Sequence, residues 1–198
     1  YLQFAIASSA TSWSMEQVPD VAVLVILKKL KHSFPKRCDF AVFRFEKLGL
    51  PQKRRRVIAG SPDVVARLRR VAPWRTPVSR IIEKPRGTHI RNRMCNIKTA
   101  YTPSGERYLV KATKYSLATP VSGPSHTILA KASMRWASPS TDLPLLPFTA
   151  RESAAVQTFP STYRLHHRKC YALQGVGNAL PPLVATQLLC DSVRHSKL

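Results

Sequence analysis

The chain has 198 residues, of which 44% are hydrophobic, and its formal net charge at pH 7 is +22. The apolar fraction predicts a packed core and excludes a disordered protein, and the length suits one sizeable domain or one and a half small ones. No apolar run reaches membrane-spanning length, so no membrane-spanning segment is expected within these residues. The charge indicates a polyanionic partner, nucleic acid before an anionic membrane, although a solvated basic surface gives the same balance.

Targeting and redox signals are few. No secretory signal is visible and the first residue is Tyr1, so we expect a piece of a longer intracellular protein. The cysteines form no C-x-x-C pair, which fits a reducing compartment. His166, His167 and Cys170 lie close together, but without a second ligand cluster they predict no metal site.

Glu16 is the first candidate functional residue along the chain. It lies between Met15 and Val18 at the end of a hydrophobic stretch, where a carboxylate is costly to desolvate without a partner. It is either a surface residue at a helix entry or the end of a buried strand that points into a cleft. In the second case burial would raise its pKa and let it donate a proton.

Residues 20–32 are predicted to form a helix, and a buried strand over 21–27 is the alternative. The helix has an apolar stripe and ends in lysines, which suit the helix dipole; the stripe consists of Val23, Ile26, Leu27 and Leu30. Residues 40–45 are aromatic and β-branched and predict a strand. Ser61 and Pro62 predict a second helix start with a hydroxyl cap, followed by the stripe Val64, Val65, Leu68 and Val71.

The basic run over 53–56 has two interpretations. It is a localisation signal or a solvated turn, or it is the entrance to the core strand that residues 57–59 predict. Strand side chains alternate between faces, so Gln52, Arg54 and Arg56 would then share one face. Planar hydrogen-bonding groups on one face can contact a base edge or hold phosphates.

From about residue 75 to residue 143 the sequence is rich in proline, serine and threonine and loses its periodicity. Tyrosines interleave with dispersed basic residues, which suits contact with a DNA backbone and base edges; a linker-like insertion is the alternative. The basic residues include Arg86, Arg91, Arg93, Lys98, Arg107, Lys111 and Lys114.

Regular secondary structure is predicted again from about residue 148. Thr149 and Glu152 predict a capping box and a helix that ends near Phe159. Further on, Gly175 and Gly177 predict a tight turn close to a ligand. The prolines after that turn predict the start of a last helix, whose apolar face carries Val184, Leu188 and Leu189.

Together these stretches resemble the DNA cytosine-5 methyltransferases. The family's Glu-Asn-Val motif resembles residues 16–18, and its Gly-x-Pro and Gln-x-Arg-x-Arg motifs match residues 49–56. Its Arg-Glu…Gln-x-Phe-Pro motif matches Arg151, Glu152, Gln157, Phe159 and Pro160. Its Gly-Asn-x-x-Pro-Pro motif matches Gly177, Asn178, Pro181 and Pro182. These motifs occur in the family's order, with the longest gap where the variable recognition region belongs.

The resemblance implies an α/β fold: the C-terminal part of a Rossmann-like, S-adenosylmethionine-dependent methyltransferase sheet, plus a smaller, irregular β-rich target-recognition domain. Residues 1–80 would be the C-terminal half of the catalytic domain. Residues 81–162 would form the target-recognition domain, and residues 163–198 would return to the catalytic domain.

The resemblance also implies methyl transfer from S-adenosylmethionine to C5 of a cytosine flipped out of double-stranded DNA. Glu16 would hold the N3 and amino edge of the base, Arg56 would hold O2, and Arg54 would support them. Asn178, with Gly177 and Ala179, would line the cofactor pocket. The implied DNA-binding residues are Gln52, Arg86, Arg91, Arg93, Lys98 and Arg107.

Two departures from the family pattern stand out. Gln17 replaces the usual asparagine, and neither the Phe-x-Gly-x-Gly loop nor the Pro-Cys dipeptide of the nucleophile is present. Activity is therefore expected to need a complementary N-terminal half, from the same gene or a separate subunit, in the nucleus or nucleoid. The alternatives are a non-catalytic DNA-binding or regulatory remnant and a small basic RNA- or ribosome-associated protein.

Overall fold

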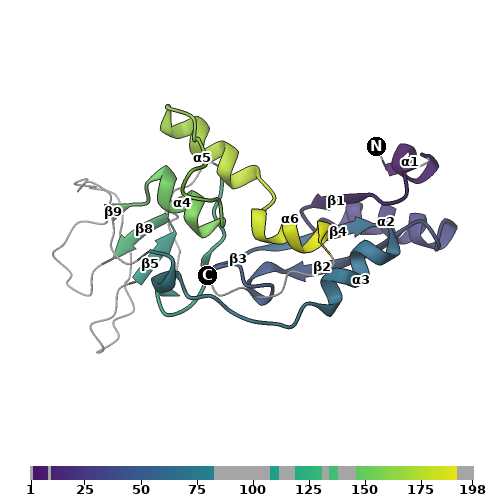
Figure 1. Ribbon diagram of the computed structural model, residues 1–198, viewed down its shortest axis with the longest axis horizontal. Coiled ribbons are helices and arrows are strands. Elements are labelled where there is room, and N and C mark those ends of the chain that lie inside the picture. Colours follow the sequence, from purple (N-terminus) through teal and green to yellow (C-terminus); the bar gives the residue numbers. More distant parts are fainter. Residues whose placement is uncertain are drawn as a thin grey trace.

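The computed structural model describes residues 2–8, 10–82, 108–111, 119–130, 134–137 and 146–190. The molecule is elongated, with a sheet and its helices at one end and a smaller β-rich unit at the other (Figure 1). The helices are α1 (Leu2–Ala7), α2 (Val21–Ser33), η1 (Phe45–Lys47), α3 (Pro62–Arg70), η2 (Val78–Arg80), α4 (Ala150–Val156), α5 (Lys169–Asn178) and α6 (Pro182–Leu189). The strands are β1 (Ser14–Gln17), β2 (Asp39–Arg44), β3 (Gln52–Lys53), β4 (Arg55–Gly60), β5 (Tyr108–Lys111), β6 (Thr119–Pro120), β7 (Ser125–His126), β8 (Met134–Ala137) and β9 (Leu146–Pro147).

The larger unit is an α/β arrangement in three layers around a sheet of order β1-β4-β2. The central strand β4 pairs antiparallel with both neighbours, and its residues Val57, Ile58 and Ala59 are fully buried. Because strand side chains alternate, Val57 and Ala59 pack with α1 and α2, while Ile58 packs with α3 and α6. The predicted core strand over 57–59 is therefore confirmed.

The helix predicted over 20–32 is confirmed as α2, and the alternative strand is wrong. Asp20 is its N-cap and accepts a hydrogen bond from the backbone N–H of Ala22 at 2.9 Å. Leu27 is fully buried, whereas Ile26, which the apolar stripe places in the core, is 51% exposed. The sheet covers only one narrow side of α2, and the next residue along a helix points about 100° away. Ile26 therefore lies outside that side.

The second predicted helix is α3, which begins at Pro62 and buries Val64 and Leu68. Its predicted hydroxyl cap is wrong, because the side chain of Ser61 makes no capping hydrogen bond. The Ser61 hydroxyl oxygen instead accepts from the backbone N–H of Trp13 at 3.0 Å. This bond fastens the segment before β1 to the start of α3.

The smaller unit is built on an antiparallel sheet of order β6-β5-β8-β9. Its core joins the sheet to α4 and α5 through buried residues that include Met134, Trp136, Phe148, Val156 and Val176. The ring centroids of Trp136 and Phe148 lie 4.8 Å apart. Strand β3 pairs in parallel with β7, and this short ladder joins the two units at Gln52 and Ser125.

Thr149 and Glu152 form the predicted capping box at the start of α4. The helix ends at Val156, earlier than predicted, because Thr158 takes a positive φ of 65° that a helix does not contain. The Thr158 hydroxyl oxygen accepts from the backbone N–H of Leu183 at 3.1 Å. The bend that ends α4 therefore also supports the first turn of α6.

The predicted tight turn at Gly175 and Gly177 is wrong, since both glycines lie inside α5. The chain turns after α5, and Pro182 begins α6 as the proline pattern predicts. Leu188 is buried, but Leu189, which the sequence places on the same face, is 77% exposed because it ends the helix beyond the core. α5 packs in the core of the smaller unit and α6 in that of the larger one, so this helix pair links them.

Asp39 ties α2, β2 and α3 together, and its contribution to stability should depend on pH. It accepts hydrogen bonds from Lys31 and Arg69, each at 2.6 Å. Burial by itself raises the pKa of Asp39, but the bonds from the two cations outweigh burial and hold the pKa below 3.8. Ionised Asp39 therefore stabilises the fold above pH 3.8, and this contribution is lost as the pH falls through the lower folded-state pKa.

We expect Asp39→Asn to lower the free energy of unfolding by about 1 kcal/mol at pH 7 and to change it little in acid, because the two cations are half exposed. Thermal unfolding from pH 7 to acid measures this difference. Asp63→Asn is the control, since Asp63 is 59% exposed and lies 3.7 Å from Arg67. Parallel pH profiles for the wild type and Asp39→Asn would contradict the assignment.

Candidate active site

Glu16 and Arg56 meet on the sheet face that packs with α3 and α6. Glu16 lies directly opposite Ile58, and Arg56 is two residues before Ile58 on β4, so the three side chains share a face. Arg56 Nε is 2.7 Å from Glu16 Oε1, and the side chains of Arg56 and Glu16 are 16% and 18% exposed. Glu16 Oε1 makes no hydrogen bond within the described residues, so the contact is an ion pair alone. Solvent reaches part of this pair.

Arg54 lies behind the pair and is 1% exposed. Its guanidinium is 3.8 Å from Glu16 and donates to the carbonyl oxygens of Gly177 at 3.0 Å and Ala179 at 3.2 Å. These carbonyls lie at the negative end of α5, so they and Glu16 offset the cost of burying the charge. Burial is the main cause that lowers the pKa of Arg54 to about 10; Arg56 lowers it further and Glu16 raises it. Arg54 therefore stays protonated at neutral pH.

Gln52, Arg54 and Arg56 form a row of polar side chains, and Gln52, the first of them, is fully buried. Its Nε2 donates to Gln157 Oε1 at 2.7 Å, and its Oε1 accepts from the backbone N–H of Ile128 at 2.9 Å. Gln157 Nε2 in turn donates to the carbonyl oxygen of Val176 at 2.7 Å. The predicted DNA contact by Gln52 is therefore corrected: without exposed surface, its amide joins β3 to α5 through Gln157.

The row of polar residues changes from buried to accessible along its length. Gln52 and Arg54 are covered, whereas Arg56 is partly exposed beside Glu16. A solvated turn or a localisation signal does not fit these positions, because Arg54 is one of the largest fully buried side chains. One carboxylate faces two guanidinium groups here, so the site is positive and suits a ligand with electronegative atoms.

A model of the C-5 cytosine-specific DNA methylases matches residues 79–193. The chain belongs to this family. It is similar to the crystal structure of the Dnmt2 methyltransferase of S. pombe, with a TM-score of 0.59 and 14% sequence identity. The similarity covers 92% of this chain and 66% of that chain, slightly less than two thirds. The predicted α/β methyltransferase fold is thus confirmed, and a search of curated proteins finds no match.

The residues predicted to line a cofactor pocket of this methylase-family chain fit that role only in part. Asn178 is exposed at the end of α5. Gly177 is buried, and a Cβ there would lie 2.4 Å from the backbone nitrogen of Ala130. Gly177 and Ala179 both direct their carbonyl oxygens at Arg54. Asn178 is therefore the one of these three residues whose side chain is exposed.

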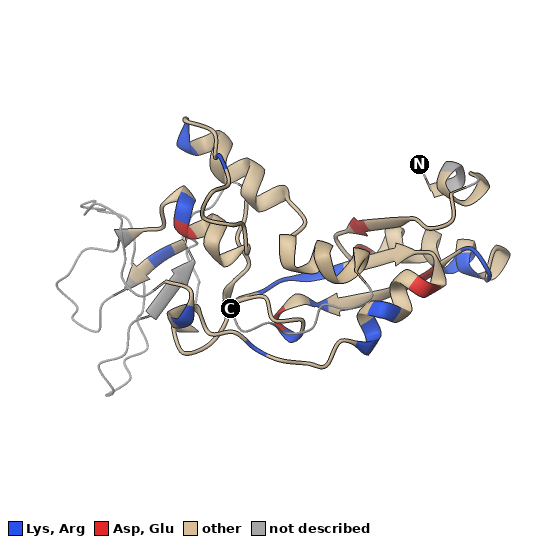
Figure 2. Ribbon diagram, in the orientation of Figure 1, with Lys and Arg blue, Asp and Glu red and all other residues tan. Residues whose placement is uncertain are grey.

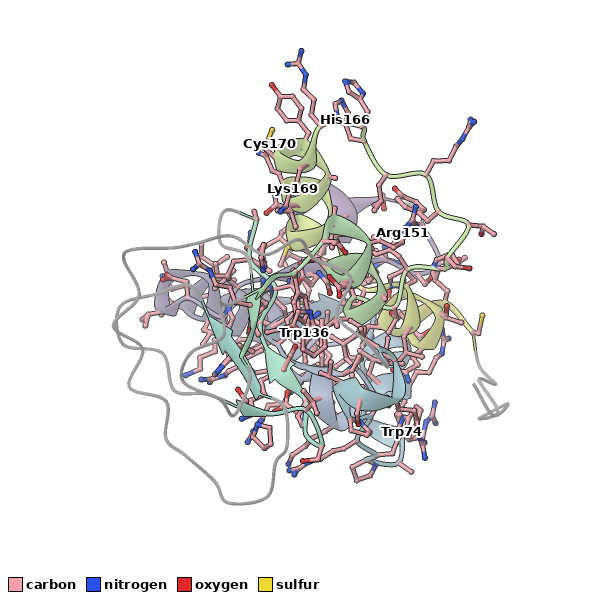
Figure 3. All side chains as sticks on the ribbon, turned by 90° about the vertical axis from the view of Figure 1, so that its left-hand side faces the viewer. Trp74, Trp136, Arg151, His166, Lys169 and Cys170 are labelled. Carbon is pink, nitrogen blue, oxygen red and sulfur yellow. The ribbon has the colours of Figure 1, made fainter. Side chains whose placement is uncertain are left out.

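The matched Arg-Glu…Gln-x-Phe-Pro motif has a structural role. Glu152 accepts from the backbone N–H of Thr149 at 2.7 Å and from Trp136 Nε1 at 3.2 Å. Figure 3 shows Arg151 above the packed centre that holds Trp136. The bond between Gln52 and Gln157 spans 105 positions, and sequence reasoning missed it. The sequence did contain a signal for this contact, because both glutamines are uncharged polar residues and both belong to motifs that match the family.

Several predictions fall outside the described part of the chain. These are the DNA contacts Arg86, Arg91, Arg93, Lys98 and Arg107. Within the described ranges, no group of three or more His, Cys, Asp or Glu side chains is placed to hold a metal ion. None of the described helices has both the length and the apolar character to cross a membrane.

Proposed function

We propose that this chain is the cytosine-binding part of a DNA cytosine-5 methyltransferase, which transfers a methyl group from S-adenosylmethionine to C5 of a flipped cytosine. The observation that carries the proposal is the partly exposed ion pair of Glu16 and Arg56, held from behind by buried Arg54. A carboxylate beside a guanidinium presents an acceptor and donors side by side, as the edge of a cytosine requires. Family membership supports the substrate class.

In this proposal the target base leaves the duplex at a cost of about a few kcal/mol and enters the site. Glu16 accepts from the exocyclic amino group and, once protonated, donates to N3, while Arg56 donates to O2. Negative charge develops on the ring when a thiolate of the complementary half adds to C6. A proton that Glu16 gives to N3 and the positive charge of Arg56 at O2 stabilise it. Arg54 is a positioning residue, because it contacts Glu16 and not the base.

S-adenosylmethionine, when bound, supplies an electrophilic methyl group. Asn178 would offer its exposed side-chain amide, which has both a donor and an acceptor, at one edge of the cofactor. Gly177 and Ala179 contribute indirectly, because their carbonyl oxygens hold Arg54. We assign the remaining cofactor contacts to the complementary half, which carries the glycine loop.

Two surfaces support docking of that half. Strand β1 pairs with β4 alone among the described strands, so its other edge presents backbone groups that a further strand can bond. On one face of the same sheet, α2 leaves Val21 76% and Ile26 51% exposed. An open strand edge and exposed apolar side chains on the same unit suit a large partner surface. The half can come from the same gene or from a separate subunit.

Double-stranded DNA is the proposed partner of the basic segment within residues 81–162, the proposed target-recognition domain. Its contacts would be Arg86, Arg91, Arg93, Lys98 and Arg107. This partner would place the protein in the nucleus or nucleoid. The alternative is a non-catalytic DNA-binding remnant. It is favoured by Gln17, whose side chain accepts from the backbone N–H of Val18 at 2.8 Å where the family motif has asparagine.

The substitution Glu16→Gln tests whether Glu16 is catalytic. It is made in the enzyme reconstituted with its complementary half. We expect kcat for methyl transfer to fall about 100- to 1,000-fold, because the amide keeps the shape of the side chain but cannot give a proton to N3. DNA affinity should change less than about twofold, since phosphate contacts supply most of it. Single-turnover methyl transfer and fluorescence anisotropy measure the two quantities.

Glu46→Gln is the matched control. Glu46 is 3% exposed and pairs with Arg44 at 2.7 Å, whereas Glu16 pairs with Arg56 and Arg54. Its kcat should equal that of the wild type. A Glu16→Gln enzyme with wild-type kcat would favour the non-catalytic alternative.

A further inference from the structure

A basic surface projects from the molecule at the start of α5, outside the Glu16 site. This surface, termed the α5 tip, consists of the exposed residues Arg164, His166, His167, Arg168, Lys169 and Tyr171. Figure 3 shows His166, Lys169 and Cys170 at the end of α5 that extends away from the body of the molecule. Figure 2 shows Lys and Arg at this end and no Asp or Glu beside them.

The α5 tip carries positive charge without a counter-charge. Arg164, Arg168 and Lys169 form no ion pair with any described residue. The sequence contains no Asp or Glu between Glu152 and Asp191. Like charges so close together repel one another, and folding gains nothing from bringing them together. A polyanionic ligand would remove this repulsion.

The aromatic rings of the α5 tip contact one another. The His166 and His167 rings stack with centroids 4.3 Å apart, and Tyr171 lies edge-on to His166 at 5.0 Å. The backbone N–H of Arg168 donates to His166 Nδ1 at 3.0 Å, which fixes the orientation of that ring. Flat rings and hydrogen-bond donors placed between cations are typical of surfaces that bind a sugar–phosphate backbone.

We propose that the α5 tip binds the phosphodiester backbone of a nucleic acid independently of its sequence. That the nucleic acid is duplex DNA rests on the proposed function, whereas RNA offers the same backbone chemistry. α5 has 10 residues, and its last turn holds Arg54 through Gly177. A helix of this length spans about 15 Å. The same rigid helix would therefore fix the distance between the bound backbone and the arginine behind Glu16.

The test compares two variants that remove equal charge. One carries Arg164→Gln, Arg168→Gln and Lys169→Gln; the control carries Lys28→Gln, Lys29→Gln and Lys36→Gln, which are exposed on and after α2. Fluorescence anisotropy measures binding of short DNA duplexes of two unrelated sequences over a range of salt. We expect the α5-tip variant to bind both about tenfold or more weakly, with a salt slope shallower by up to about three, and the control to change less than about twofold.

Binding of RNA duplexes of the same sequences shows whether the α5 tip binds the backbone of DNA, of RNA or of both. A loss of affinity for DNA alone, RNA alone or both supports the proposal and assigns the surface to that ligand. Equal losses in the two variants, no loss in the α5-tip variant, or a loss confined to one sequence would overturn it. Because the readout is binding, failure here leaves the kcat test of Glu16 unaffected.

Discussion

Arg54→Met is expected to lower the free energy of unfolding by about 3 kcal/mol. Methionine fills much of the space but cannot donate to Gly177 and Ala179, so two backbone carbonyls at the end of α5 lose their partner. Glu16 also loses one of its two cations. Chemical denaturation followed by circular dichroism measures the change.

Arg55→Met is the matched control, because Arg55 is the next residue and is exposed. Its effect should stay within about 0.5 kcal/mol, as expected for a surface substitution. If the Arg54→Met and Arg55→Met proteins unfold at the same denaturant concentration, the buried guanidinium does not hold α5 against the larger unit.

Gly177→Ala is expected to lower the free energy of unfolding by about 2–4 kcal/mol, because the new methyl group has no space. Its Cβ would lie 2.4 Å from the backbone nitrogen of Ala130 and 2.6 Å from the carbonyl carbon of Leu129. Backbone atoms cannot swing aside as a flexible side chain can. α5 must then move away from residues 129–130. This movement separates the carbonyl oxygens at the end of α5 from Arg54.

Gly175→Ala supplies the control within the same helix. A Cβ at Gly175 meets nothing within 4 Å, and alanine favours a helix by about 0.5–1 kcal/mol over glycine. The two substitutions should therefore change stability in opposite directions. Denaturation midpoints compare them directly, and stabilisation by both would show that α5 does not pack closely on residues 129–130.

Elements set by local signals could be predicted from the sequence. The stripe that includes Leu27 predicted α2, the run at Val57 predicted the buried strand, and the capping box at Thr149 predicted α4. The alternation of Gln52, Arg54 and Arg56 also placed polar groups in one row. In each case neighbouring residues along the chain determine the structure, so a short window of sequence contains the information.

Contacts between distant segments could not be predicted. Arg54 reaches Gly177 across 123 positions, and no local pattern tells which helix end will cover an arginine. The glycines of α5 illustrate the same point, because Gly177 serves close packing against Ala130 and not a turn. The sequence likewise could not show that the sheet leaves Ile26 exposed.

Methyl transfer by a reconstituted enzyme tests most directly whether the Glu16–Arg56 site acts on cytosine. The chain is combined with a half from the family that carries the glycine loop and the Pro-Cys motif. Size-exclusion chromatography and circular dichroism confirm a folded one-to-one complex that binds duplex DNA. Labelled methyl groups from S-adenosylmethionine should then appear at C5 of cytosine and disappear with Glu16→Gln. A folded, DNA-binding complex that transfers no methyl group would contradict the proposed function and leave a DNA-binding remnant.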